Sequence, residues 1–253
     1  MDTLGVGLIH RELGDAYLKH ISSKNLIPQW CDARRSFWAA INNIPATDYP
    51  QDYLSALWGY CKTSLLVTEI NDTIATLLRQ ATDVRDRLLT QAPTEAHRDR
   101  SSAPSPNLNE LTVDFLLTQN KTILALETAE ADKNGLMQWL LTNSPGTTTY
   151  PEMRQMLVPK SAIVYWYLST NTITTFILRS DHPEPIVISQ RDRIISMKER
   201  DRLDEWIKTW NKTYADQRKK SKANDQKTDW YITMPTQLET LAEILHIPAL
   251  LPT

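Results

Sequence analysis

Residues 161–178 read SAIVYWYLSTNTITTFIL, and this stretch decides the fold expected for the C-terminal part of the chain. Its opening part, 161–168, is almost wholly apolar and rich in β-branched and aromatic residues, which is typical of a buried central strand. A turn follows, and residues 173–178 predict the antiparallel partner strand. A second turn at 182–185 leads to a short third strand at 186–188. The stretch therefore predicts a small antiparallel β-meander.

The predicted meander leaves one edge of its most apolar strand open. Such an edge carries unpaired N–H and C=O groups, which natural proteins usually protect. A strand as apolar as 161–168 normally lies inside a larger sheet. We therefore expect the missing strands to be supplied beyond residue 253 or by another chain.

Residues 1–142 show helical periodicity throughout, beginning with Leu4 and Leu8. The most regular stripe predicts a single helix over about 62–91, in which apolar residues recur every three or four positions. Only six residues of the chain are glycine, which agrees with few tight turns. Residues 100–107, RSSAPSPN, interrupt the pattern and predict an exposed linker.

Helices are expected again after the meander. Leu203, Trp206 and Trp210 share one helical face, where tryptophans are more often core anchors than stacking platforms for bases. The basic run at 217–227 predicts a solvated helix end, and Pro235 suits the first turn of a last helix. The expected fold class is therefore mainly α with a small antiparallel β-meander.

Composition and charge exclude several classes of function. The formal net charge of -2 argues against a nucleic-acid-binding protein. The scarce glycines form no phosphate-binding loop, no dinucleotide-binding turn and no nucleophile elbow. No secretory signal or membrane-spanning run is found, so we expect a soluble cytoplasmic protein without a membrane partner. No cofactor, metal or small-molecule site is evident.

Two cysteines and several histidines are the candidates for nucleophilic or metal chemistry. Cys31 and Cys61 each follow an aromatic residue in a helical pattern, so we interpret them as small packing residues. A catalytic cysteine and histidine can be far apart in the sequence and meet only in the folded chain, so the sequence alone leaves such a pair open. His10 and His20 are ten residues apart, which is not the spacing of two ligands on one helical face. Surface or capping roles are expected for the remaining candidates, His97 and His182.

Clusters of acidic residues have structural explanations in this sequence. Glu127 and Glu130 lie three residues apart, with Asp132 beyond them. Carboxylates do acid–base work when burial shifts their pKa values, but these three avoid the apolar face of the predicted helix. Asp201 and Asp204 are expected to favour a helix N-terminus. No catalytic residue is therefore assigned.

The run from Lys160 to Arg179 resembles the opening hairpin of CHAT domains, the caspase-like peptidase domains often found behind tetratricopeptide helices. In that family a short helix ending in leucine and proline precedes the hairpin, and YPEMRQMLVPK at 150–160 matches this order. The helices with LDEWIKTW at 203–210 and LETLAEILHIPALL at 238–251 also fit the pattern. The resemblance covers residues 150–253, about two-fifths of the chain, and implies the N-terminal portion of an α/β caspase-like domain.

One departure from that family decides the expected activity. CHAT peptidases use a histidine and a cysteine, and both motifs would follow the segment around His246. Neither motif is present in this sequence. We therefore expect the chain not to be an enzyme by itself, and we carry no catalytic role onto His246.

The upstream helices resemble tetratricopeptide repeats. The run LGDAY at 13–17 is similar to the core of that repeat, in which a glycine lets paired helices approach. His10 stands where the repeat usually has tryptophan, and the period of about 34 residues is not clearly sustained. The resemblance implies that region 1–142 presents a surface to a protein partner.

The expected function is a non-catalytic interaction or regulatory module that resembles the front part of a CHAT peptidase. Three alternatives stay open. The chain is half of a split peptidase completed by another chain, or a truncated fragment without a function of its own. In the third alternative it is a hydrolase that uses Cys31 or Cys61.

Overall fold

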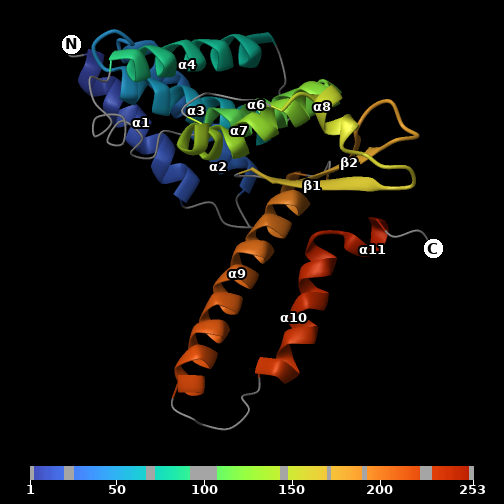
Figure 1. Cartoon of the computed structure of the whole chain (residues 1–253). Coiled ribbons are helices and arrows are strands. Elements are labelled where there is room, and N and C mark those ends of the chain that lie inside the picture. Colours follow the sequence, from blue (N-terminus) through green and yellow to red (C-terminus); the bar gives the residue numbers. More distant parts are fainter. Residues whose placement is uncertain are drawn as a thin grey trace. The chain divides into compact units, whose positions relative to one another are not determined.

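The computed structural model describes residues 3–19, 26–66, 72–91, 107–142, 148–169, 172–189, 193–222 and 230–250. The chain divides into two compact units, Met1–Thr149 and Tyr150–Thr253. Figure 1 shows that the described part is mainly helical and contains one small antiparallel sheet. The fold class predicted from the sequence is therefore confirmed.

The first unit is an array of paired helices. Its described helices are α1 (Thr3–Lys19), α2 (Leu26–Asn43), α3 (Pro50–Leu66), α4 (Asp72–Gln91), α6 (Leu108–Thr118) and α7 (Thr122–Thr142). Helices α1 to α4 each pack against the next one, and α6 packs against α7. Helix α3 also contacts α1 and α6, so it lies at the centre of the array.

A fully buried aromatic ring joins the first three helices. Phe37 on α2 is only 1% exposed. A Cβ atom added to Gly14 on α1 would lie 2.8 Å from Cε1 of this ring, and one added to Gly59 on α3 would lie 2.5 Å from it. The close helix approach predicted at Gly14 is thus confirmed.

The long helix predicted over about 62–91 is wrong. Residues 62–66 form the end of α3, and a separate helix, α4, begins at Asp72 and packs against α3. Residues 67–71 lie outside the described residues. The apolar stripe continues because both helices face one core, and an apolar period does not reveal where one helix ends and the next begins.

Most of the predicted linker at 100–107 lies outside the described residues. Its last residue, Asn107, caps α6, because its side-chain oxygen accepts a hydrogen bond from the backbone N–H of Asn109 over 3.1 Å. Such a cap satisfies a backbone donor that the first helical turn leaves unpaired.

The second unit combines a sheet with a helical hairpin. Its elements are α8 (Tyr150–Gln155), β1 (Ala162–Leu168), β2 (Ile173–Arg179), β3 (Ile186–Ser189), α9 (Arg193–Lys222), α10 (Trp230–Ile244) and α11 (Ile247–Leu250). Figure 1 shows α9 and α10 as two helices that lie side by side. A small core of Ile173, Leu203 and Ile244 joins the sheet to this hairpin.

The strand order is that of the predicted meander. The order is β1-β2-β3 and both pairings are antiparallel, so β1 lies at one edge of the described sheet. That further strands complete the sheet beside β1 stays a prediction. The central strand is β2, where Phe176 is fully buried. The burial predicted for residues 161–168 is wrong for most of the strand, because Tyr167 is the one residue of β1 that is buried in the described part of the chain.

Pro235 also departs from its predicted position. Helix α10 begins at Trp230, so Pro235 lies inside the helix and not in its first turn. Because proline has no N–H group, the helical hydrogen bond from residue 235 to the carbonyl of residue 231 is missing.

Candidate functional site

The two cysteines do not form a catalytic centre with any described histidine. Cys61 on α3 is fully buried, and desolvation raises the pKa of its thiol to about 12. Cys31 on α2 is half-buried. Within the described ranges, neither sulfur has a hydrogen bond to a histidine. The packing role predicted for Cys61 is confirmed, since a thiol this hard to ionise is a poor nucleophile.

The histidines occupy separate places in the structure. His10 is half-buried on α1, and among the described residues its Nδ1 atom has no hydrogen-bond partner. His182 is exposed in the turn after β2, where its Nδ1 atom lies 2.6 Å from the carbonyl oxygen of Glu184. The surface role predicted for His182 is therefore confirmed. His20 and His97 lie outside the described residues.

His246 closes the end of α10. It has a positive φ of 54°, and its Nε2 atom lies 3.5 Å from a carboxylate oxygen of Glu199 on α9. This contact ties the two helices of the hairpin together. Asp204, expected near a helix N-terminus, lies well inside α9, because the helix begins at Arg193. There it forms an ion pair with Arg200, one turn earlier.

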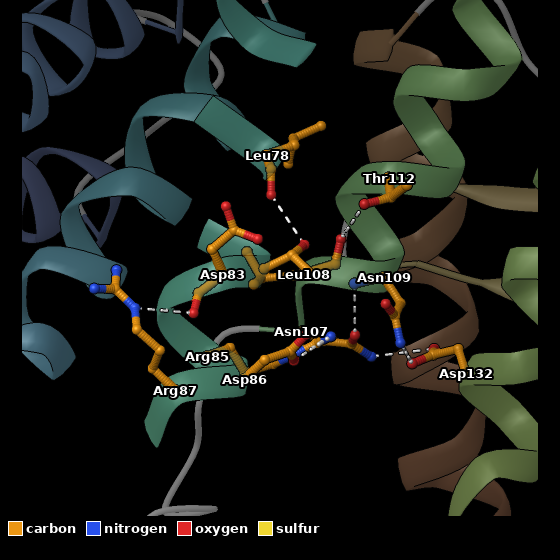
Figure 2. A network of polar contacts seen from close by, with 11 residues as sticks. Leu78, Asp83, Arg85, Asp86, Arg87, Asn107, Leu108, Asn109, Thr112 and Asp132 are labelled. Atoms are coloured by element: carbon orange, nitrogen blue, oxygen red, sulfur yellow. Dashed lines mark hydrogen bonds and ion pairs between the residues drawn. The ribbon is translucent and has the colours of Figure 1, made fainter. Parts of the chain in front are cut away.

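Figure 2 shows that Asp132 on α7 is held by two amide side chains. Asn107 donates from Nδ2 to one carboxylate oxygen, and Asn109 donates to the other, both over 3.1 Å. Both asparagines belong to the start of α6, so Asp132 fastens this helix end to α7. Asp132 therefore has a structural role.

A group of charged residues lies on α1, α3 and α6, which we call the α3 surface: Arg11, Asp15, Asp52, Lys62 and Glu110. Arg11 donates to Asp52 over 2.8 Å and so links α1 to α3. The Lys62 ammonium lies 4.7 Å from the centre of the Trp58 ring, a cation–π arrangement. Burial lowers the pKa of Lys62, while the negative charges of Glu110 and Asp15 oppose that shift. Burial likewise raises the pKa of Asp15.

Sequence reasoning missed the α3 surface. Its members come from three helices, and no spacing within one helix connects them. A lysine among apolar residues on α3 was the only available signal, and lysine stems often cover apolar surface without any special role.

The outer side of β1 is a second candidate site. Ser169 donates from its backbone N–H to the carbonyl of Thr172 over 3.0 Å, directly at the end of the hairpin. In an antiparallel pair of strands, the backbone N–H and C=O groups of successive residues point alternately toward the partner strand and away from it. The backbone N–H of Ser169 points toward the chain that forms β2, so every second residue before it does the same. The N–H and C=O groups of the residues between them therefore point away from β2: Ala162, Val164, Trp166 and Leu168. We call these four the edge residues.

The edge residues have free backbone groups within the part of the chain that the structure describes. There, β1 pairs only with β2, and no hydrogen bond reaches the edge residues on their outer side. Trp166 is anchored through its side chain, because its indole N–H donates to the carbonyl of Leu245 over 3.4 Å. Ile173, which lies opposite Leu168 on the same face, packs against Leu203 of α9 and Ile244 of α10. The side chains of the edge residues therefore share the face of the sheet that the helical hairpin covers.

An open hollow of about 330 Å³ lies between α9 and α10. Arg202, Glu205 and Trp206 line it from α9, and Gln237 and Thr240 line it from α10. The Trp206 indole N–H is already used, since it donates to the carbonyl of Gln237 over 2.8 Å. This hollow could not be predicted from the sequence, because its lining comes from two helices.

Comparison with known proteins adds no family: no family model, no curated protein and no solved structure matches the chain significantly. Among the described helices, none has both the length and the apolar character needed to cross a membrane. Within the same residues, no three histidine, cysteine or acidic side chains gather as a metal site would require.

Proposed function

We propose that the chain is a non-catalytic protein-interaction module that resembles the front part of a CHAT peptidase and is completed by another polypeptide. The observation that carries the proposal is the open edge of β1. An edge strand with free backbone groups is a template for pairing with a further strand.

The composition of β1 strengthens this proposal. Its sequence AIVYWYL contains no charged residue and no proline. Natural proteins protect exposed edges with lysine, proline, bulges or very short strands. The seven residues of β1 include neither lysine nor proline. Leaving such an edge in water favours aggregation, whereas pairing with a partner strand satisfies its donors and acceptors.

The α3 surface supports a further contact with a protein partner in the helical region. Its charges lie on three adjacent helices, as expected of a helical array that presents one face to a protein. Lys62 has no oppositely charged atom within 4.0 Å among the described residues, and we propose that a carboxylate of the partner pairs with it. We place this interaction in the cytoplasm.

Co-expression tests the proposal. The tagged chain is produced together with the polypeptide encoded immediately downstream, and the purified material is analysed by size-exclusion chromatography with light scattering. We expect a stable one-to-one complex that the substitution Val164→Pro disrupts and Val164→Thr preserves. Absence of a complex, or a complex that Val164→Pro leaves intact, would contradict the proposal.

Half of a split peptidase is the second candidate function. It is consistent with the lack of a hydrogen bond from Cys31 or Cys61 to a histidine among the described residues, since the catalytic pair would then come from the other chain. An acyloxymethyl ketone peptide, which alkylates catalytic thiolates, separates the two candidates. Labelling of the second chain only within the complex supports the split peptidase. Labelling of Cys31 in the isolated chain would instead overturn the non-catalytic assignment.

A further inference from the structure

The edge residues of β1 are complementary to themselves. We infer that, when no other strand occupies the edge, β1 pairs antiparallel with β1 of a second copy of this chain about a twofold axis. This inference rests on the proposed function, because it uses the same open edge, and it names one particular occupant.

The alternation of backbone groups selects a single register. In a twofold antiparallel pair, all four edge residues find partners only when Ala162 lies opposite Leu168 of the second copy and Val164 lies opposite Trp166. Each directly opposed pair exchanges two hydrogen bonds, which gives about eight across the junction. A shift by two residues leaves an edge residue of each copy unpaired.

The side chains suit this register. Each small side chain, Ala162 or Val164, faces a large one, Leu168 or Trp166, and no charge of β1 is brought opposite a like charge. Leu168, now 40% exposed, would become covered. Because the same surface is used on both copies, the contact closes on itself as a dimer and does not extend into a fibre.

The helical layer continues across the junction. The twofold axis stands perpendicular to the sheet, so α10 of both copies covers the same face. The two Trp166 side chains become diagonal neighbours about 7–8 Å apart. Packed helices lie about 8–10 Å apart, so the two helix ends above the tryptophans can lie against each other.

Tyr165 lies on the axis and provides a register-specific test. It faces Tyr165 of the second copy as a pair without hydrogen bonds between the two residues, with Cβ atoms about 4.5–5.5 Å apart. Disulfides need a Cβ separation of about 3.5–4.5 Å, so a small movement allows one to form. The variant Tyr165→Cys, made in a Cys31→Ser chain, is therefore expected to form a disulfide-linked dimer under mild oxidation.

The matched control is Leu168→Cys in the same background. Leu168 is more exposed than Tyr165, so a cysteine there would form a disulfide more readily if linkage depended on exposure alone. The proposed register, however, places residue 168 opposite Ala162. We expect no disulfide dimer from this variant. Linkage at residue 168 in place of residue 165 would overturn the register.

A second measurement keeps the test valid if Tyr165→Cys does not fold. Sedimentation of the otherwise unchanged chain should show a dimer that Val164→Pro weakens by about tenfold or more, since it removes an outward N–H donor. Val164→Thr keeps the N–H and should sediment like the original chain. Edge strands tolerate proline at outward positions, so circular dichroism should be unchanged.

Each result separates this inference from the proposed function. A chain that stays monomeric, or whose dimer is insensitive to Val164→Pro, overturns the inference. If that monomer nevertheless binds the downstream polypeptide through β1, the proposed function stands. A Val164-sensitive dimer that is linked through residue 165 supports the self-pairing of the edge, whether or not another chain also binds.

Discussion

A Cβ atom on Gly59 of α3 would lie 2.5 Å from the ring of Phe37 on α2, closer than side chains pack. The substitution Gly59→Ala should therefore lower the free energy of unfolding by about 1–3 kcal/mol through overpacking. Urea denaturation measures this loss. In the double variant with Phe37→Leu the two losses should be less than additive, because the smaller side chain makes room. Additive losses would show that this contact is not the cause.

These glycines show how far the sequence could predict the helical unit. The LGDAY run predicted the close approach at Gly14, and the structure confirms it. Gly59 carried no such signal, since nothing in the sequence says that α3 approaches the same ring. Likewise, the stripe over about 62–91 could not show that one helix ends at Leu66 and another begins at Asp72.

The candidate sites needed the structure for a different reason. The residues of β1 predicted a strand, its partner and the order of the meander correctly, but not which backbone groups of β1 face away from β2. The outward direction of these backbone groups was deduced from the hydrogen bond between Ser169 and Thr172, which the sequence does not reveal. The α3 surface needed the packing of three helices.

Burial of Cys61 predicts a loss of stability at high pH. The thiol has a pKa of about 12 in the folded chain against 9.0 for an exposed one, so the unfolded chain releases the proton first. Its contribution to stability is complete below pH 9 and is lost as the pH rises toward 12. At pH 10.5 this loss amounts to about 2 kcal/mol, at about 1.4 kcal/mol per pH unit.

Comparison with Cys61→Ala isolates that effect from other groups that ionise in the same range. The stability gap between the original chain and this variant, measured by urea denaturation, should narrow from pH 8 to pH 10.5. At pH 8, iodoacetamide should label the half-buried Cys31 in the folded chain and reach Cys61 only after unfolding. A constant gap with rapid labelling of Cys61 would contradict its burial.

The desolvated ammonium of Lys62 predicts a stabilising substitution. Its pKa is lowered from 10.5, so protonation favours the unfolded chain at neutral pH. Lys62→Met removes that cost and should raise the free energy of unfolding by about 1 kcal/mol at pH 7. The original chain gains stability as the pH rises from the lowered pKa toward 10.5, so the advantage of the variant should shrink there.

Arg35→Met provides the control for the Lys62 substitution, because Arg35 is a cation whose side chain is 79% exposed. We expect its thermal unfolding midpoint to stay close to that of the original chain, since exposed ion pairs contribute little. A lower midpoint for Lys62→Met would mean that attraction to Glu110 and Asp15 outweighs the desolvation of the ammonium.

The alternation along β1 predicts which backbone amides exchange with solvent. In the dilute, unpaired chain, the amides of Val164 and Trp166 point outward and should exchange quickly, whereas those of Tyr165 and Tyr167 are bonded to β2 and should exchange slowly. Mass spectrometry with residue-level fragmentation measures this difference. Raising the concentration should slow only the outward amides, as self-pairing requires. Uniformly slow exchange at every dilution would mean that another part of the chain already covers the edge, and both proposals built on that edge would fail together.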